Sequence, residues 1–292
     1  MKITLLILFI CAQTFAQKIV FKGTLLDKES KNPIAYANIS FIDVKKGIST
    51  LEDGSFELEI KKKYLNKKVH ISCLNYNDTL VLAQDLNNKI IYLTPKAYEL
   101  EEIVLKNSKK RNKELIIKKI KRKELKLSLA GVIERPWTVA RYFEYKENYK
   151  ETPYIKTVTV FSSRFEKRKA KFRIRIFSKD AITALPKDDL LKENMIVDIK
   201  TRGKNVQIDV SKYNIEIPEN GFFIALERLH IPYNFHEFEM KFKGGTIKKV
   251  NGVAPDFGAI GTSNEKFYGY LSGKWYRRSS TFVPAIFVTL SN

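Results

Sequence analysis

A turn dipeptide between two β-patterned runs is the sequence feature that most restricts the fold of this chain. The dipeptide is Asp53-Gly54, and it lies within residues 47–60, which read GISTLEDGSFELEI. Glycine accepts a positive φ without steric cost, so the pair suits a tight turn. After it, Phe56, Leu58 and Ile60 alternate with polar residues, which places the three apolar side chains on one face of a strand. We therefore expect a β-hairpin with a structural role and not a catalytic loop.

Further short β runs lie on both sides of this turn. They are expected at residues 19–26, 35–44, 69–74, 79–82 and 89–93. About seven strands with turn signals roughly every ten residues are typical of a small antiparallel sandwich. The first domain is expected to span residues 17–95.

An ordered set of glycine, proline, aspartate and aromatic positions runs through this first domain. In order, the set consists of Gly23, Asp27, Pro33-Ile34, Ala37-Asn38-Ile39, Gly47, Ser49-Thr50, residues 52–56 and residues 73–76. It resembles the motif of the carboxypeptidase-regulatory-like domain over residues 19–94, which implies a transthyretin-like seven-stranded sandwich. Two positions depart from the family pattern. Leu51-Glu52 stands where Thr-Asp is more common, and Asn75 stands where a glycine usually precedes Tyr76, although asparagine tolerates a left-handed turn.

The segment after this domain supports a location in the bacterial envelope. Residues 98–105 read YELEEIVL, which is similar to a run that follows the same domain in bacterial envelope proteins. Those proteins include TonB-dependent outer-membrane receptors, in which a plug and a large barrel come next. The chain is too short to hold them, so the resemblance implies a free-standing envelope module.

The N-terminus has the pattern of a secretory signal peptide. Lys2 precedes an apolar core at residues 3–12, and Thr14-Phe15-Ala16 provides a small-residue exit. The core of about ten residues is shorter than the ~20 that span a bilayer. Cys11 suggests lipidation as an alternative, but no small residue precedes it. We expect residues 1–16 to be removed, and the mature chain to be exported from a Gram-negative cell, without a transmembrane span, to the periplasm or the outer membrane.

The net charge restricts the classes of partner that we expect. The formal net charge is +21. For an exported chain this favours anionic polysaccharide, lipopolysaccharide or phospholipid head groups over nucleic acid, and the alternative is a basic soluble surface without a specific partner.

Cys73 is the one cysteine outside residues 1–16, so no intramolecular disulfide is expected, and its place in an apolar run suggests a small buried side chain.

A strongly basic segment joins the two expected domains, at residues 96–130. Within it, residues 106–126 contain eleven Lys or Arg and two Glu. The apolar residues Leu115, Ile116, Ile117, Ile120 and Leu125 are spaced for one face of a helix. Two interpretations stay open: a basic amphipathic helix on a membrane or an acidic partner, and a linker helix that packs its apolar stripe on a neighbouring domain.

Alternating β patterns resume in the second domain, residues 131–292. They are clearest at residues 172–176 and 206–210, where one face is apolar and the other polar. About nine strands with few helical signals favour a two-sheet sandwich of the jelly-roll type. The domain resembles carbohydrate-binding jelly rolls at the level of fold alone. The sequence therefore predicts an all-β protein with a helical linker.

The sequence offers no recognisable catalytic or cofactor motif. Its three histidines are His70, His230 and His236. His236 and Glu239 have His-x-x-Glu spacing, but no third histidine follows, and an opportunistic metal site of His230 and His236 with Glu227 or Glu239 is the alternative to ordinary turn residues. Cys73 has no identifiable base. We therefore assign no catalytic residue, no metal and no cofactor.

Aromatic residues near the C-terminus are the candidate binding residues. They are Tyr268, Tyr270, Trp275 and Tyr276, which would form a flat platform for sugars, or would instead fill the core of the sandwich. The function that we expect is a non-enzymatic envelope binding module for glycans or anionic envelope components, with an outer-membrane protein as a further partner. The alternatives are a polysaccharide or cell-wall hydrolase, which needs a converging pair of carboxylates, and a basic peripheral membrane protein.

Overall fold

The chain divides into two compact units, each of which is described by itself. The computed structural model describes residues 17–97, 113–129, 134–163, 169–199, 205–242 and 244–292. Unit 1 comprises Met1–Ala97 and Glu134–Pro136, and unit 2 comprises Tyr98–Ile133 and Trp137–Asn292. Among the described residues, no helix has the length and apolar character needed to cross a membrane. The expected signal peptide, residues 1–16, lies outside the described residues.

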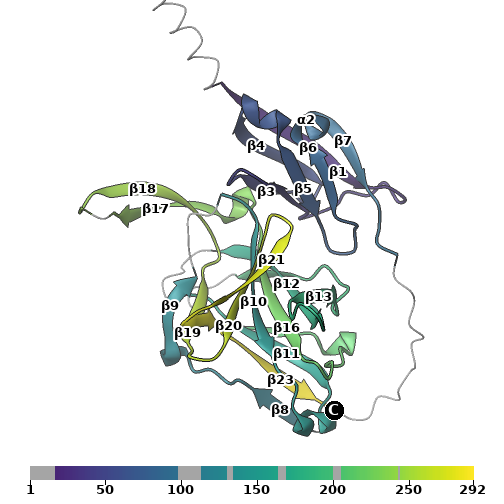
Figure 1. Cartoon of the computed structure of the whole chain (residues 1–292), viewed down its shortest axis with the longest axis vertical. Helices are drawn as coiled ribbons and strands as arrows, with labels where there is room; N and C mark the ends of the chain where they lie inside the picture. Colours follow the sequence, from purple (N-terminus) through teal and green to yellow (C-terminus); the bar gives the residue numbers. More distant parts are fainter. Residues whose placement is uncertain (1–16, 98–112, 130–133, 164–168, 200–204, 243) are drawn as a thin grey trace, which may run out of the picture. The chain divides into compact units, whose positions relative to one another are not determined.

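Unit 1 is built from two sheets (Figure 1). The three-stranded sheet has the order β4-β1-β7, with β1 parallel to β7, and the four-stranded sheet has the antiparallel order β3-β2-β5-β6. The elements are β1 (Lys18–Asp27), β2 (Asn38–Phe41), β3 (Gly47–Ser49), β4 (Ser55–Lys61), η1 (Lys62–Asn66), β5 (Lys68–Ser72), β6 (Thr79–Leu82), α2 (Ala83–Leu86) and β7 (Lys89–Leu93).

The alternation expected after the turn is present and fills the core of unit 1. Phe56 and Ile60 in β4 are buried beside Phe21 of β1, whereas Glu57 and Glu59 are exposed or partly exposed on the other face. The rings of Phe21 and Phe56 lie 5.1 Å apart. Phe56 and Ile60 are thus buried and Leu58 is partly buried, so the period-2 pattern correctly identifies the inward face of β4. The structure as a whole is mostly β, in agreement with the predicted class.

The turn at Asp53-Gly54 joins two sheets and is not the tip of a hairpin. β3 pairs with β2, and β4 pairs with β1, so the two strands beside the turn belong to different sheets. The turn itself is as predicted, because Gly54 has a φ of +75° and the Ser55 amide donates a 2.9 Å hydrogen bond to Asp53 Oδ1. The Leu25 amide donates to the Gly54 carbonyl oxygen at 2.9 Å. This bond fixes the turn against β1. The prediction of a hairpin was wrong, because β3 and β4 do not pair with each other.

Unit 2 contains four sheets in its described residues, with more strands than the nine or so expected. A seven-stranded sheet has the order β13-β12-β16-β10-β20-β21, with β14 also on β12, and the others are β15-β11-β23-β8, β22-β19-β9 and β17-β18. The strands are β8 (Glu114–Ile117), β9 (Leu125–Leu129), β10 (Trp137–Phe143), β11 (Tyr154–Phe161), β12 (Ala170–Lys179), β13 (Pro186–Asp189), β14 (Ile196–Ile199), β15 (Asn205–Asp209), β16 (Phe222–Arg228), β17 (Phe235–Lys241), β18 (Ile247–Val253), β19 (Phe257–Gly261), β20 (Lys266–Leu271), β21 (Lys274–Ser279), β22 (Phe282–Pro284) and β23 (Ile286–Ser291). Short 3₁₀ turns are η2 (Arg122–Glu124), η3 (Glu147–Glu151), η4 (Ser211–Tyr213) and η5 (Pro232–Asn234).

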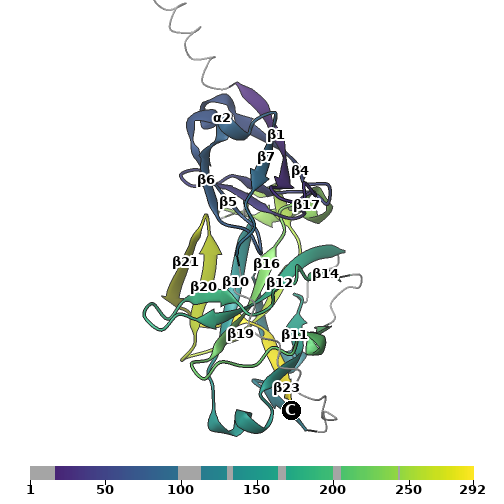
Figure 2. The same cartoon turned by 90° about the vertical axis from the view of Figure 1, so that its right-hand side faces the viewer.

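The main core of unit 2 lies between the seven-stranded sheet and the four-stranded sheet. Ile174 of β12 and Ile224 of β16 belong to it from one side, and Val158 of β11 and Val288 of β23 from the other, each with almost no exposed surface. Figure 2 shows the seven-stranded sheet as successive strands β21, β20, β10, β16 and β12. The opposite face of this sheet carries the candidate site.

The helix expected over residues 106–126 is absent from the described part of that segment, and the prediction was wrong there. Residues 114–117 form β8, which pairs with β23, and residues 125–129 form β9, which pairs with β19. Ile117 is buried in the main core while Ile116 is 43 % exposed. Successive residues on opposite faces fit a strand, and β-branched isoleucines favour one. Residues 98–112 lie outside the described residues.

Substitution of Gly54 by alanine should destabilise unit 1. A Cβ atom at this position would lie 2.4 Å from the Leu25 carbonyl oxygen, in addition to the left-handed φ. We expect a loss of about 1–2 kcal/mol from the backbone conformation and a further ~1–3 kcal/mol from the overlap, measured by denaturant unfolding. The matched control is Gly245→Ala, because Gly245 has a φ of +85° but no atom within 4 Å of its Cβ position. Equal losses for the two variants would contradict the assigned packing role.

Candidate functional site

The four predicted aromatic residues do not share one surface. In β20, Tyr268 and Tyr270 point to one side of the seven-stranded sheet, and Trp275 of β21, which pairs with Tyr270, points to the same side. Tyr276 pairs with Gly269 and points to the other side. A platform of all four residues is therefore not present, because neighbours along a strand face opposite ways.

Tyr276 belongs to the side of the sheet that faces the main core. Its ring covers Gly269, where an added Cβ atom would lie 2.2 Å from the ring. Trp137 Nε1 donates a 3.1 Å hydrogen bond to Tyr276 Oη. The ring also stacks near Phe267, with centroids 6.3 Å apart. This residue has a packing role, which is the alternative that the sequence left open.

The opposite face of the sheet carries a set of aromatic residues that we call the aromatic cluster. Its members are Tyr142, Phe177, Phe223, Tyr268, Tyr270 and Trp275. Phe223 lies between Tyr142 and Tyr268, with centroid distances of 5.0 and 4.8 Å. Sequence reasoning missed Tyr142, Phe177 and Phe223. Side chains alternate between the two faces along β10, β12 and β16, so each of the three residues lies on the face opposite the main core. Only the order of the strands in the sheet brings them next to β20.

This face of the sheet is concave. Trp275 of β21 contacts Phe177 of β12, with ring centroids 5.6 Å apart, although three strands separate β21 from β12 in the sheet. In a flat sheet, four strand spacings would separate these backbones by roughly 19 Å. The sheet must therefore curl around the aromatic cluster, which fills the concave side as a second small core.

Exposure within the aromatic cluster differs from residue to residue. Phe223 and Tyr268 are buried, with 0 % and 6 % of their surface exposed. Tyr270 and Trp275 are partly exposed, and their rings lie 5.2 Å apart. The part of the cluster that a ligand can reach is therefore the pair formed by Tyr270 and Trp275, together with the edge of Tyr142.

Cationic side chains line the same face. Lys179 Nζ lies 4.9 Å from the centre of the Tyr142 ring and 3.3 Å from Tyr142 Oη. Tyr142 Oη donates a 2.8 Å hydrogen bond to the Asn220 carbonyl oxygen. Arg277 pairs with Tyr268 across β20 and β21. Burial raises the pKa of Tyr268, and the charges of Arg277 and Lys179 oppose that rise. The rim of the aromatic cluster is therefore basic.

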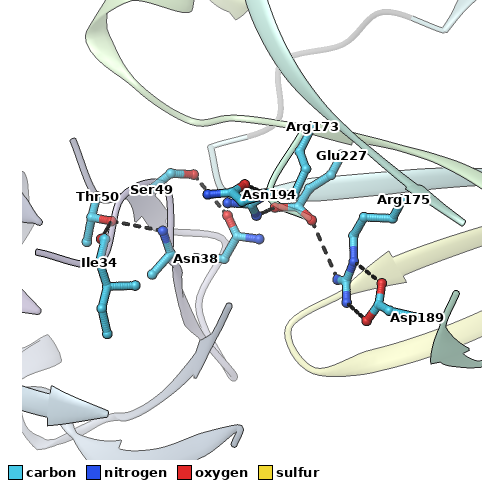
Figure 3. A network of polar contacts seen from close by, with 10 residues as sticks. Ile34, Asn38, Ser49, Thr50, Arg173, Arg175, Asp189, Asn194 and Glu227 are labelled. Carbon is cyan, nitrogen blue, oxygen red and sulfur yellow. Dashed lines mark hydrogen bonds and ion pairs between the residues drawn. The ribbon is translucent and has the colours of Figure 1, made fainter. Parts of the chain in front are cut away.

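Alternating arginines and carboxylates form a second feature of this face (Figure 3). Arg173 Nη1 donates to Glu227 Oε1, and Arg173 Nε donates to Asn194 Oδ1 at 2.7 Å. Arg175 forms a bidentate pair with Asp189, at 2.9 and 2.6 Å, and its Nη1 lies 3.6 Å from Glu227 Oε2. Only 1 % of the Arg173 and Glu227 side chains is exposed. We call these four charged residues the ion chain.

The ion chain neutralises charges that would otherwise be buried alone. Burial lowers the pKa of Arg175, but the attraction of Asp189 and then of Glu227 is larger, so its pKa is raised overall. Both carboxylates are held by arginines, so neither is free to act as the general acid of a hydrolase. The arrangement is suited to fixing the curled face and not to proton transfer.

The histidines do not assemble a metal site in the described residues, where no group of three His, Cys, Asp or Glu is placed to hold an ion. Glu227 is held in the ion chain, and the ring of His230 packs 4.7 Å from Phe235. His236 and Glu239 lie on opposite faces of β17, since they are three residues apart in one strand. The His-x-x-Glu spacing therefore gives no common ligand set.

Unit 1 contains its own buried polar contacts, also drawn in Figure 3. Thr50 Oγ1 accepts a 2.8 Å hydrogen bond from the Ala37 amide and donates to the Ile34 carbonyl oxygen at 2.7 Å. Ser49 Oγ donates to Asn38 Oδ1 at 2.9 Å. The polar residues of the family motif thus bind backbone and side chains within the domain, as buried polar groups must.

Two other residues of that motif meet across unit 1. Tyr76 Oη donates a 2.7 Å hydrogen bond to Asp27 Oδ2, and the amides of Glu29 and Ser30 donate to Asp27 Oδ1 at 2.8 Å. Asn75, which precedes Tyr76, has a φ of +69°, the left-handed conformation that asparagine tolerates. These contacts hold the turn after β1 against the segment after β5.

Loss of the Glu227 charge should destabilise unit 2. In Glu227→Gln, the buried Arg173 and the partly buried Arg175 keep their charge while one partner becomes neutral, which we expect to cost about 3 kcal/mol or more. The matched control is Glu151→Gln, since the Lys113–Glu151 pair is 63 % and 72 % exposed, and no measurable change is expected there. Denaturant unfolding followed by tryptophan fluorescence measures both. An unchanged free energy of unfolding in Glu227→Gln would show that the ion chain contributes nothing.

The Asp27 contacts predict acid sensitivity of unit 1. The hydrogen bonds from the Ser30 amide and from Tyr76 lower the pKa of Asp27 from its usual value of 3.8. A lowered folded-state pKa stabilises the fold above pH 3.8, and this contribution is lost as the pH falls through the folded-state value. Asp27→Asn should therefore be less stable than the parent at neutral pH and should approach it at pH values below 3.8. A constant difference between pH 2 and pH 7 would contradict the assignment.

Comparison with known proteins adds a family for unit 1. Comparison with curated proteins finds no significant match to the chain. A family model described as the CarboxypepD_reg-like domain matches residues 21–105, which include Asp27, the Asp53-Gly54 turn and Tyr76. This domain is typically a binding or interaction module. Apart from the first residues of β1, the two sheets lie within the matched range, as do the turn that joins them and the Asp27–Tyr76 contact. Residues 21–105 are a CarboxypepD_reg-like domain.

Proposed function

We propose that this protein is a non-enzymatic, exported envelope protein in which unit 2 binds a glycan that carries anionic groups. The observation that carries the proposal is the rim of the aromatic cluster. Tyr270 and Trp275 are partly exposed as a ring pair, and Lys179 and Arg277 lie on the same face of the sheet. Flat rings bind the apolar faces of sugars, and the cations bind carboxylate or phosphate substituents.

Unit 1 supports the same proposal from a different direction. Its family is typically a binding or interaction module, so we assign to it contacts with a protein partner at the outer membrane. Export is supported by the apolar core and small-residue exit in residues 1–16, and the charge of +21 suits an anionic envelope. The arginine partners of Glu227 and Asp189 support a binding role over hydrolysis.

Glycan binding should depend on Trp275. We expect Trp275→Ala to weaken binding to an acidic envelope polysaccharide roughly fivefold or more, because the loss of one ring removes about 1 kcal/mol of stacking energy. Isothermal titration calorimetry against such a polysaccharide measures the affinity. The control is Tyr213→Ala, because Tyr213 is a partly exposed tyrosine of η4, outside the seven-stranded sheet.

Two further measurements separate the parts of the proposal. Lys179→Gln should weaken binding to the acidic polysaccharide but not to a neutral one of the same backbone. Release of reducing ends from either polymer by the parent protein would show that it is an enzyme. Equal affinities of the parent and Trp275→Ala for every polymer that binds would remove the rim as the binding site.

A further inference from the structure

A two-stranded arm in unit 2 lacks the support that the other strands have. β17 and β18 pair with each other, from Phe235 opposite Val253 to Lys241 opposite Ile247, and with no other strand of the described residues. Figure 1 shows the arm reaching away from β9 and β19. An isolated two-stranded hairpin is at best marginally stable in water. We call the two strands with their connecting turn the arm.

The end of the arm exposes two large apolar side chains. Phe242 is 42 % exposed and Ile247 is 60 % exposed. The Phe242 amide donates to the Thr246 carbonyl oxygen at 2.9 Å, and the Gly245 amide donates to the Phe242 carbonyl oxygen at 3.0 Å. These bonds close the turn, so both apolar side chains are held at its base. A Cβ atom on Gly244 or Gly245 would have no atom within 4 Å, so the turn is also exposed.

The two apolar side chains point to opposite faces of the arm. Ile247 lies opposite Lys241, and Phe242 follows Lys241 in the chain, so Phe242 and Ile247 belong to different faces. Phe242 continues the face of Phe238 and Met240. A surface that covers only one face would leave one of the two side chains in water. A medium that takes up the end of the arm from both sides would cover both.

The charges on the arm change sign along its length. Lys241 and Lys248 lie at the outer end, Lys249 lies one residue further in, and the sequence has no acidic residue from 241 to 249. Glu237 and Glu239 lie nearer the body of unit 2, with Glu239 opposite Lys249. The end that carries the exposed apolar side chains is therefore the cationic end. We call Lys241, Phe242, Ile247, Lys248 and Lys249 the tip.

We propose that the tip inserts into the interface of an anionic lipid bilayer. Aromatic and aliphatic side chains surrounded by lysines are the composition that partitions into the region between head groups and acyl chains. Each lysine gains electrostatic energy near an anionic leaflet. Insertion of the end of the arm covers both of its faces, while Glu237 stays outside and Glu239 lies beside its cross-strand neighbour Lys249. This site is separate from the aromatic cluster, so the proposal does not depend on glycan binding.

The test uses the chain from Gln17 to Asn292, which contains every described residue. Co-sedimentation is measured with vesicles of phosphatidylcholine alone and of phosphatidylcholine mixed with phosphatidylglycerol. We expect binding to the mixed vesicles and weak binding to the neutral ones. Phe242→Ser with Ile247→Ser should reduce the partition coefficient roughly tenfold or more. Lys248→Gln with Lys249→Gln should reduce it roughly 25-fold, or about fivefold for each lysine. The control is Ile182→Ser, since Ile182 is 94 % exposed at the turn between β12 and β13.

A fluorescence measurement distinguishes insertion from surface attraction. Phe242→Trp should show an emission shift to shorter wavelength on the mixed vesicles, relative to the spectrum of the parent, and Ile182→Trp should show none. Binding without that shift, or equal binding of the parent and the serine double variant, would overturn the proposal. So would a change of oligomeric state in the serine double variant without vesicles, because a second copy of the chain would then be what covers the tip.

Discussion

The burial of β16 on both faces is the constraint on which unit 2 depends. All seven residues from Phe222 to Arg228 are buried, and β10 and β12 each pair with this strand along its length. Ile224 and its alternate neighbours fill the main core, while Phe223 and Glu227 face the concave side. A single strand thereby fixes the main core, the aromatic cluster and the ion chain in one register, because a slip by one residue would exchange its two faces.

The concave face combines two requirements that oppose each other. A curled sheet brings distant strands together, and side chains must fill the space on its concave side. The rings of the aromatic cluster fill this space. The same face also buries charged residues, which is costly unless each charge is paired. The ion chain satisfies this requirement with alternating signs. Of the aromatic cluster, Tyr270, Trp275 and the edge of Tyr142 remain partly accessible beside the cationic rim, so a small area of a large face is exposed.

Positive charge is spread widely along the sequence, but the structure gives its parts different roles. In residues 113–126 the lysines accompany the two edge strands β8 and β9 and not a helix, so the membrane contact first considered for a basic helix has no support in that part. At the tip of the arm, lysines surround exposed apolar side chains. Lysines thus flank strands that are paired into larger sheets in one place, and in the other they flank a two-stranded arm that pairs with no other strand of the described residues, which is where we propose membrane binding.

The sequence by itself determined the mainly β class, the alternating faces of the strands and the Asp53-Gly54 turn, because these depend on residues that are close in the chain. Only the tertiary structure decided that β3 and β4 belong to different sheets, that Ile116 and Ile117 lie in a strand, and that Trp275 meets Phe177 while Tyr276 faces the main core. These outcomes depend on which strands pair, and pairing is set by contacts between segments far apart in sequence. A local pattern defines the two faces of a strand, but the fold decides what each face meets.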